Sequence, residues 1–356
     1  MLLDAVVVGA GIHGLCAAFH LRRRGLRVTV LEQFGHGNNS GSSHGMTRII
    51  RSSYHDPRYV RLAKKARQEG WPLLEQELHT TLLHRTNGLF FGPEQGLFAD
   101  YLRATLGSGA DVQRIPVDLA RAKFPLFLFR DDDAVMLDHT AGLLSAEETM
   151  RGLLAWCGEH EVEVRDNTKV NALHSEDSCV QINTSHGVLF TRRVVLACGA
   201  WLAKLIPELQ PQLSVIPQEV GYFELDAPSE ATRVGTFPVW ARIGADAADF
   251  RYGLPEFGRA GVKCAQHKTT GAFIDPDALR KAPDEAQMLQ LARTTFNVKV
   301  RGLLATESCL YTMAPEEHFI LRHHHADTRI AIVSACSGHG FKFGPVIGKE
   351  AADLLA

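Results

Sequence analysis

The sequence predicts an α/β protein in which a domain with a parallel sheet is interleaved with an α+β domain built on an antiparallel sheet. Two patterns predict these domains: a buried strand followed by a glycine-rich turn and a helix near the N-terminus, and a run of strand-like segments between 213 and 263. Strands of the first kind recur in the middle and at the end of the chain. No single linker therefore divides the two domains.

The segment 4–33 alternates strand, turn, helix and strand. Val6-Val7-Val8 form an uninterrupted β-branched run, which is typical of a strand buried on both faces of a parallel sheet. The apolar stripe of the following helix consists of Ile12, Leu15, Cys16 and Phe19. Gly25 ends this helix, and Val28 to Leu31 predict the second strand.

The turn Gly9-Ala10-Gly11-Ile12-His13-Gly14 has the spacing of a dinucleotide-binding motif. Gly9 permits the tight turn, Gly11 lets the backbone approach a pyrophosphate, and Gly14 lets helix and strand pack closely. Glu32 follows Gly14 by 18 positions (32 − 14) and stands at a strand tip, where it can accept hydrogen bonds from a ribose. We therefore predict a Rossmann-like domain that binds its dinucleotide here, with FAD and NAD both open.

Composition limits the class of protein. The chain has 356 residues, of which 45% are hydrophobic and 22% charged, and a formal net charge of −2. This balance predicts a globular enzyme without a nucleic-acid partner, and no apolar run approaches the roughly 18 residues of a membrane span. Seven cysteines without a CxxC pair favour reduced thiols. Because the chain runs straight into its first strand, we expect no signal peptide and a cytoplasmic location.

A glycine- and serine-rich segment, 34–45, follows the first unit. One interpretation is a flexible surface loop. The other is a backbone that presses against a flat cofactor, because Arg48 and Arg51 follow directly and would suit an anionic ligand. The second interpretation is favoured.

The rest of the chain predicts the division into domains. Strands at 162–164, 187–190 and 194–198 should return to the first sheet, the last one ending at Gly199 beside the cofactor, whereas strands within 215–264 should form the antiparallel sheet. A helical region is expected from Asp277 to about Phe296. The Rossmann-like domain then comprises 1–81, 141–212 and 305–356, and the second, substrate-binding domain 82–140 and 213–304.

Four motifs together resemble one family. They are the N-terminal glycine turn, Gly41-Ser42-Ser43-His44-Gly45-Met46-Thr47-Arg48-Ile49-Ile50-Arg51, Cys309-Leu310-Tyr311-Thr312-Met313-Ala314-Pro315-Glu316-Glu317-His318-Phe319 and Ser337-Gly338-His339-Gly340-Phe341-Lys342-Phe343. In this order they resemble the monomeric sarcosine oxidase family of D-amino-acid-oxidase-like flavoproteins, which includes N-methyltryptophan oxidase and pipecolate oxidase. The motifs are far less specific for the substrate than for the family.

The resemblance implies FAD, joined through a thioether between Cys309 and the 8α carbon of the flavin. Without its motif, Cys309 would more often be a plain buried thiol. The matching positions that imply cofactor contacts are Ser43, His44, Arg48, Gly338, His339, Gly340 and Lys342. Backbone donors around His339 would face the pyrimidine oxygen of the flavin, where negative charge develops on reduction.

The resemblance also implies roles in catalysis. Lys263 resembles the family lysine that assists the reaction with O2, although a lysine on a strand is more commonly solvated. Arg51 and Lys342 resemble the pair that holds the substrate carboxylate. Arg48 would lie near the flavin ring. His267 and Tyr252 resemble pocket residues, with a purely structural histidine as the alternative for His267.

These parts predict a monomeric FAD-dependent oxidase of a secondary amine or of an N-alkyl or cyclic amino acid, with a carboxylate-bearing amine and O2 as its small-molecule partners. Hydride would pass to the flavin, and O2 would then yield hydrogen peroxide. Three alternatives are a flavin dehydrogenase that passes electrons to a carrier, a non-catalytic flavoprotein, and an NAD enzyme. The interleaved domains disfavour the last.

Some positions depart from the family or carry weaker signals. Met46 stands where the family has an acid, and Ser43 where a histidine is common. Trp240 and Arg242 lie in the segment that borders the substrate in relatives, which suggests a larger or differently charged amine than sarcosine. Cys264 should point to the opposite strand face from Lys263. His323-His324-His325 predict a solvated turn rather than a metal site.

Overall fold

A six-stranded sheet carries the N-terminal unit, and the computed structural model describes the chain for residues 2–269 and 273–356. The sheet order is β10-β3-β2-β14-β21-β20, with β20 antiparallel to β21 and all other neighbours parallel. Its strands are β2 (Ala5–Val8), β3 (Val28–Leu31), β10 (Glu163–Arg165), β14 (Val194–Leu196), β20 (Ile320–His324) and β21 (Asp327–Ser334). All four residues of β2 are buried, as the β-branched run predicts.

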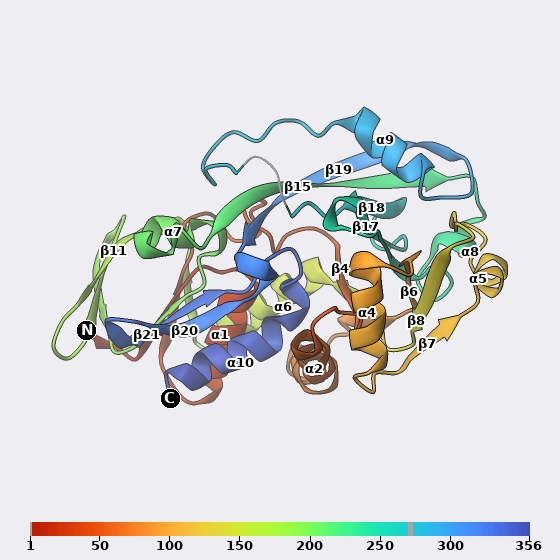
Figure 1. The fold of residues 1–356 in the computed structure, drawn as a ribbon. Coiled ribbons are helices and arrows are strands. Elements are labelled where there is room, and N and C mark those ends of the chain that lie inside the picture. The colour runs from red at the N-terminus through yellow and green to blue at the C-terminus, as the bar shows by residue number, and fades with distance from the viewer. Residues whose placement is uncertain (1, 270–272) are drawn as a thin grey trace.

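Two helices from opposite ends of the chain lie side by side against this sheet (Figure 1). They are α1 (Ile12–Arg23) and α10 (Gly344–Leu354). The predicted apolar stripe of α1 is fully buried. A Cβ on Gly348 would lie 2.5 Å from Cys16, so the glycine allows the two helices to approach closely. Helix α6 (Ala146–Glu159) also contacts α1.

One predicted strand belongs elsewhere. The segment predicted at 187–190 forms β13 in a separate four-stranded sheet of order β1-β13-β12-β11. The strands of this sheet are β1 (Leu2–Leu3), β11 (Val170–Ser175), β12 (Val180–Thr184) and β13 (Gly187–Thr191). Thr184 pairs with Gly187, so a two-residue hairpin turn joins β13 to β12 and takes it away from the parallel sheet.

An eight-stranded sheet builds the second layer, in the order β19-β15-β18-β17-β16-β6-β8-β7. The strands are β6 (Gly88–Pro93), β7 (Val112–Ile115), β8 (Asp133–Asp138), β15 (Ser214–Leu225), β16 (Val239–Ile243), β17 (Phe250–Leu254), β18 (Val262–Gln266) and β19 (Val300–Met313). Only β16 and β6 pair in parallel, which confirms an essentially antiparallel sheet. Strands β15 and β19 pair along their whole length and link both parts of the molecule (Figure 1). The predicted division between 304 and 305 falls inside β19, so the domain boundaries stay a prediction.

Smaller elements complete the fold. They are β4 (Thr47–Ile50), β5 (Leu83–Arg85) and β9 (Gly142–Ser145), which form a three-stranded sheet, and the helices α2 (Pro57–Lys65), α3 (Trp71–Leu78), α4 (Gly96–Leu106), α5 (Val117–Lys123), α7 (Leu202–Leu205), α8 (Ser229–Thr232) and α9 (Glu285–Arg293). The helix expected from 277 begins at Glu285, because the Asp284 carboxylate caps it by accepting from the backbone of Gln287.

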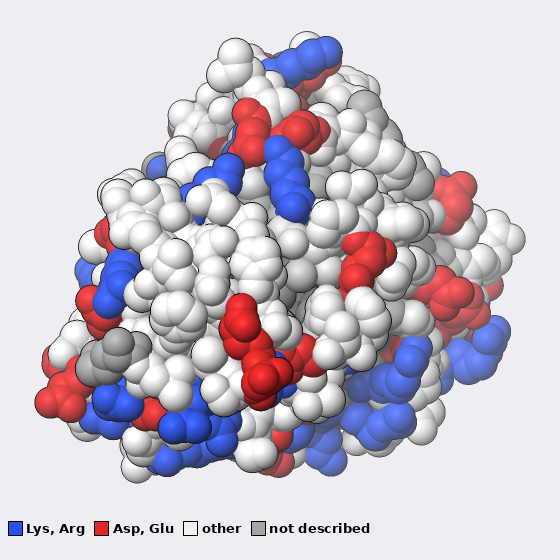
Figure 2. Space-filling view, turned by 90° about the vertical axis from the view of Figure 1, so that its left-hand side faces the viewer, with Lys and Arg blue, Asp and Glu red and all other residues white. Residues whose placement is uncertain are grey.

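The surface carries charges of both signs. On the face shown in Figure 2, acidic side chains lie next to basic ones, with broad uncharged areas between them. Within 2–269 and 273–356, no helix combines the length and the apolar character that crossing a bilayer requires.

Candidate active site

One cavity of about 910 Å³ collects the residues that the sequence singled out. The carboxyl ends of three parallel strands, β2, β14 and β21, open into it, and strands β17, β18 and β19 of the other sheet supply its opposite wall. This edge of a parallel sheet is where ligands bind in open α/β folds. The cavity therefore lies where the two sheets meet.

The glycine turn forms one end of the cavity. Gly9 has a φ of +102°, and a Cβ there would lie 2.5 Å from the Ala197 carbonyl oxygen. Gly9, Gly11, Ile12 and His13 line the cavity. Gly14 does not. A Cβ on Gly14 would lie 1.9 Å from the Gly9 carbonyl oxygen, so this glycine serves the close packing of helix on turn that the motif predicts.

Glu32 lies at the tip of β3 and lines the same end of the cavity. Its carboxylate accepts hydrogen bonds from the backbone N–H groups of Ala10, at 2.8 Å, and Phe34, at 3.0 Å. Burial raises the pKa of this carboxyl, against the effect of the two N–H donors. The hydrogen bonds fix the side chain beside the glycine turn, where the sequence places a ribose.

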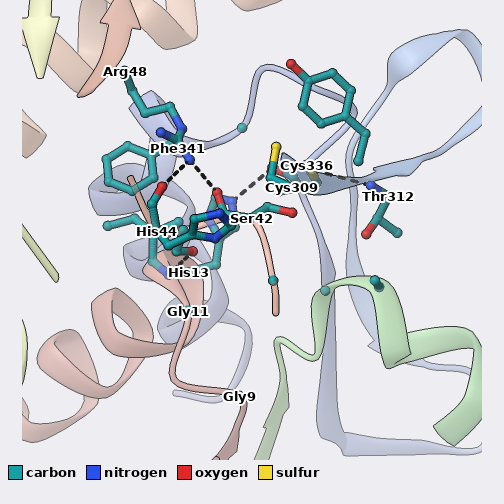
Figure 3. A pocket seen from close by; sticks show the side chains of 18 of the residues that line it. Gly9, Gly11, His13, Ser42, His44, Arg48, Cys309, Thr312, Cys336 and Phe341 are labelled. Carbon is teal, nitrogen blue, oxygen red and sulfur yellow. Dashed lines mark hydrogen bonds between the residues drawn. The ribbon is translucent and has the colours of Figure 1, made fainter. Parts of the chain in front are cut away.

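Arg48 orders the glycine- and serine-rich loop that precedes it. Its guanidinium donates to the carbonyl oxygens of Ser42 at 2.8 Å and His44 at 2.7 Å (Figure 3). The His44 Nε2 donates to the Ser308 carbonyl at 3.0 Å, and the Ser43 hydroxyl accepts from the backbone N–H of Ile12 at 3.0 Å. The loop is thus pinned between β19 and the start of α1, along the cavity wall.

Two thiols line the cavity. Cys309 projects from β19 and Cys336 follows β21, and both pack against the same small cluster around Tyr311 (Figure 3). Burial raises the pKa of Cys309, while the nearby cations Arg48 and Lys263 lower it. Cys336 Sγ accepts from the Thr312 backbone N–H at 3.5 Å. The sequence identified only the first of these thiols as part of the site.

Lys263 is the buried cation of the opposite wall. It is 4% exposed, and its Nζ donates to the Thr47 carbonyl oxygen at 3.3 Å. Burial, followed by the nearby Arg48, lowers the pKa of Lys263 to about 8. Cys264 packs in the apolar core on the other face of β18, which confirms the predicted alternation.

Arg51 and Lys342 meet at Tyr54. The Arg51 guanidinium lies 4.3 Å from the centroid of the Tyr54 ring, and Lys342 Nζ donates to the Tyr54 hydroxyl at 2.9 Å and to the His339 carbonyl at 2.6 Å. Burial, and then Arg51 and Arg48, lower the pKa of Lys342 well below its usual range. Two basic side chains from distant parts of the chain thus line the cavity together, and a bound anion would favour the ammonium form of Lys342.

The remaining predicted residues also line the cavity. The Tyr252 and Tyr311 hydroxyl groups lie 3.1 Å apart, and His267 Nε2 lies 3.6 Å from a Glu317 carboxylate oxygen. His339 Nε2 donates to the Glu317 carbonyl at 3.0 Å. The other predicted positions in the lining are Gly199, Gly338 and Gly340.

Sequence reasoning missed several lining residues: Tyr54, Tyr101, Glu307, Tyr311, Glu317 and Cys336. Tyr311 and Glu317 lie inside a quoted motif, so the motif itself was a signal for them. Glu307 lies two positions before Cys309 on the same strand, and residues two apart share a strand face. That spacing would have identified it.

Trp240 and Arg242 do not border the cavity, contrary to the prediction. Trp240 is fully buried in the apolar core with Phe127 and Phe296, and Arg242 forms a buried ion pair with Asp133 at 2.7 Å. Ala241, between them on β16, lines the cavity instead. The strand therefore presents the opposite face to the one that the prediction required.

The three consecutive histidines end β20 beside Glu208. His325 Nδ1 lies 2.9 Å and His324 Nε2 lies 3.5 Å from one Glu208 oxygen. The Ala326 backbone N–H donates to His324 Nδ1 at 3.3 Å, which places the ring proton on Nε2, facing the carboxylate. The ligand atoms of Glu208, His324 and His325 lie within 4.8 Å of one another, so the fold adds a carboxylate to the histidines, and the solvated turn stays a prediction.

The cavity lining fits a large dinucleotide. Six of its buried polar atoms have no hydrogen-bond partner among the described residues: His13 Nδ1, His44 Nδ1, Arg51 Nη1, His55 Nδ1, Thr312 Oγ1 and Ser334 Oγ. Buried polar groups in native proteins are usually paired, so these atoms fit an elongated ligand with many polar groups. The glycine turn and Cys309 line the same cavity.

Comparison with known proteins decides the family. The family model described as FAD dependent oxidoreductase matches residues 4–354. The chain belongs to the FAD-dependent oxidoreductase family. It is 30% identical to a monomeric sarcosine oxidase of Arthrobacter, over 99% of this chain and 92% of that protein. It is 32% identical to a mouse peroxisomal sarcosine oxidase, over 99% and 91%. This FAD-dependent oxidoreductase is therefore an enzyme, as its sequence predicts.

Solved structures confirm the fold of this FAD-dependent oxidoreductase. The open form of NikD, an unusual amino acid oxidase of nikkomycin biosynthesis, superposes with a TM-score of 0.85 at 23% identity, over 99% of this chain and 94% of that one. The α/β architecture with its separate antiparallel sheet is thus shared along the whole chain.

Proposed function

We propose that this FAD-dependent oxidoreductase is an oxidase of carboxylate-bearing secondary amines, either N-alkyl or cyclic amino acids. The observation that carries the proposal is the convergence of Arg51, Lys342 and Lys263 on one cavity that also contains Cys309. A paired cation site suits a carboxylate, and a separate buried cation suits the reaction with O2. The cytoplasmic location and the monomeric state stay predictions from the sequence.

The chain's own residues would hold FAD along the cavity. The residues proposed to do so are Gly9, Gly11, Ile12, His13, Glu32, Ser43, His44, Arg48, Gly199, Gly338, His339, Gly340 and Lys342. Cys309 would attach it covalently. When bound, FAD supplies the two-electron acceptor for amine oxidation. Arg48 would stay near the ring because three carbonyl oxygens of its own loop fix the guanidinium.

Arg51 and Lys342 would clamp the substrate carboxylate. Both side chains are at least nine-tenths buried, so an entering anion meets them in a site of low polarity, where charge attraction is strong. Tyr54 orients the lysine. Tyr252 and His267 would then line the space for the amine and its substituents. Fixing the acid end orients the reacting C–H bond.

Lys263 would stabilise the negative charge that develops on O2. Its cation has one neutral acceptor, the Thr47 carbonyl, and a carboxylate at 3.9 Å. The overall reaction converts the amine and O2 to an imine and hydrogen peroxide, and water then hydrolyses the imine to a carbonyl compound and a smaller amine.

A substrate panel tests this function. We expect N-methyl and cyclic amino acids to bleach the flavin without air and to release one equivalent of hydrogen peroxide in air. Matching hydroxy acids should do neither. Bleaching by amines with electron transfer to a quinone but no peroxide would instead establish the dehydrogenase alternative, and bleaching by no amine would contradict the proposal altogether.

Replacing Lys342 by methionine should weaken binding of the acid end. We expect the KM for a carboxylate-bearing amine to rise about 10- to 100-fold, because a hydrogen bond to a charged group is lost in a buried site. The matched control is the same amine without its carboxylate, for which wild type and variant should differ little. Equal effects on both amines would show that Lys342 does not bind the carboxylate.

A further inference from the structure

Glu307 is the acid nearest to the proposed O2 cation. It lies on β19 two positions before Cys309, and its side chain is 17% exposed. One carboxylate oxygen accepts from Arg259 at 2.9 Å, and the other accepts from the Tyr222 hydroxyl at 3.0 Å. The second oxygen also lies 3.9 Å from Lys263 Nζ. Two neighbours thus fix the carboxylate with one oxygen directed at the lysine.

A glycine makes room for this approach. Gly45 has a φ of +87°, and a Cβ there would lie 2.9 Å from the same Glu307 oxygen that faces Lys263. A side chain at position 45 would therefore displace the carboxylate as well as strain the backbone. The loop conformation and the position of Glu307 are fitted to each other.

The charged groups around Lys263 act in opposite directions. Arg48 on β4 and Arg259 on the loop before β18 disfavour the ammonium form, as does burial. Glu307 and Cys309, both on β19, favour it, and the Tyr222 ring on β15 lies 5.7 Å from Nζ. Cys309 is neutral as a thiol and as a thioether, so Glu307 is the carboxylate that offsets two arginines.

We propose that Glu307 is a positioning residue that keeps Lys263 in its ammonium form and directed into the cavity. Without this carboxylate, two arginines and burial would leave the amine neutral near physiological pH. Arg259 disfavours the ammonium form of Lys263, because its positive charge offsets that of the Glu307 carboxylate and repels the ammonium group. The consequence for O2 rests on the proposed function, whereas the charge state of Lys263 does not.

Competitive acetylation of the holoenzyme measures that charge state directly. Acetic anhydride reacts only with the neutral amine, so the extent of Lys263 labelling between pH 6 and 10, read by peptide mass spectrometry, gives its titration without substrate or turnover. We expect a midpoint near pH 8 in wild type. Glu307→Gln should lower it by about one pH unit, and Arg259→Gln should raise it.

The matched control is Glu219→Gln. Glu219 on β15 also pairs with a lysine, Lys268, which follows β18, at 2.8 Å, but Glu219 does not line the cavity. Its replacement should leave the Lys263 midpoint unchanged. An unchanged midpoint in Glu307→Gln would overturn the inference. If that variant fails to fold, a midpoint that does not rise in Arg259→Gln overturns it equally.

The rate of flavin reoxidation by O2, measured in the same variants, then tests the proposed function separately from the charge state of Lys263. At pH 8 the ammonium fraction of Lys263 should fall about fivefold in Glu307→Gln, and the reoxidation rate should fall with it. A shifted labelling midpoint with an unshifted rate profile would support the role of Glu307 and refute the role of Lys263 in the O2 reaction.

Discussion

Replacing Cys309 by serine is expected to abolish covalent attachment of the flavin. A serine hydroxyl is a far weaker acid and nucleophile than a thiol, whereas Cys309 has a thiol whose pKa burial raises and whose thiolate the nearby Arg48 and Lys263 favour. After acid precipitation, the yellow colour should stay in the pellet of wild type and pass to the supernatant of the variant. Mass spectrometry of the intact chain should show the same loss.

The matched control is the second thiol of the same cavity. Cys336 packs against the same cluster as Cys309, so it is the alternative attachment point that the structure offers. Cys336→Ser should keep the colour in the pellet. If the pellet of Cys336→Ser lost its colour and that of Cys309→Ser kept it, the attachment point would be Cys336 and not Cys309. A yellow supernatant from wild type would contradict covalent attachment itself.

Local patterns were sufficient to predict the parallel sheet. The β-branched run of β2, the glycine turn and the buried stripe of α1 are set by residues a few positions apart. The placement of β13 was wrong because its sequence does not encode its partner. Val188 and Phe190 of β13 are exposed, so burial does not select its partner. The two-residue turn before β13 places it next to β12 instead.

In the site, too, several residues within local motifs were predicted, whereas two residues whose placement depends on strand pairing were not placed correctly. Quoted motifs identified Arg51 and Lys342, which the structure brings to the same cavity. Trp240 and Arg242 were misplaced because a shift of one residue exchanges the two faces of a strand, and the register of β16 against β17 depends on the whole sheet. The spacing to Cys309 indicates that Glu307 shares its strand face, but only the fold supplies its three partners, Tyr222, Arg259 and Lys263.

Replacing Lys263 by methionine is expected to slow flavin reoxidation by O2 by about 100- to 1,000-fold, the typical cost of removing one preorganised group that stabilises developing charge. Methionine keeps the unbranched shape of the side chain, so the cavity wall should persist. Anaerobic bleaching by the amine should change little, because the carboxylate is held by other residues. Stopped-flow mixing of the reduced enzyme with O2 measures the first rate, and mixing of the oxidised enzyme with amine measures the second.

Lys342→Met provides the reciprocal control for this prediction. It removes an equally buried lysine from the same cavity, so a general effect of losing a basic side chain there would slow reoxidation in both variants. If position decides, Lys342→Met should weaken amine binding and leave the O2 rate within a few-fold of wild type, whereas Lys263→Met should do the reverse. Lys263 donates to the Thr47 carbonyl and Lys342 to the Tyr54 hydroxyl, so neither variant removes the hydrogen-bond partner of the other lysine. An O2 rate unaffected by Lys263→Met would assign that chemistry to another group and leave the carboxylate clamp in place.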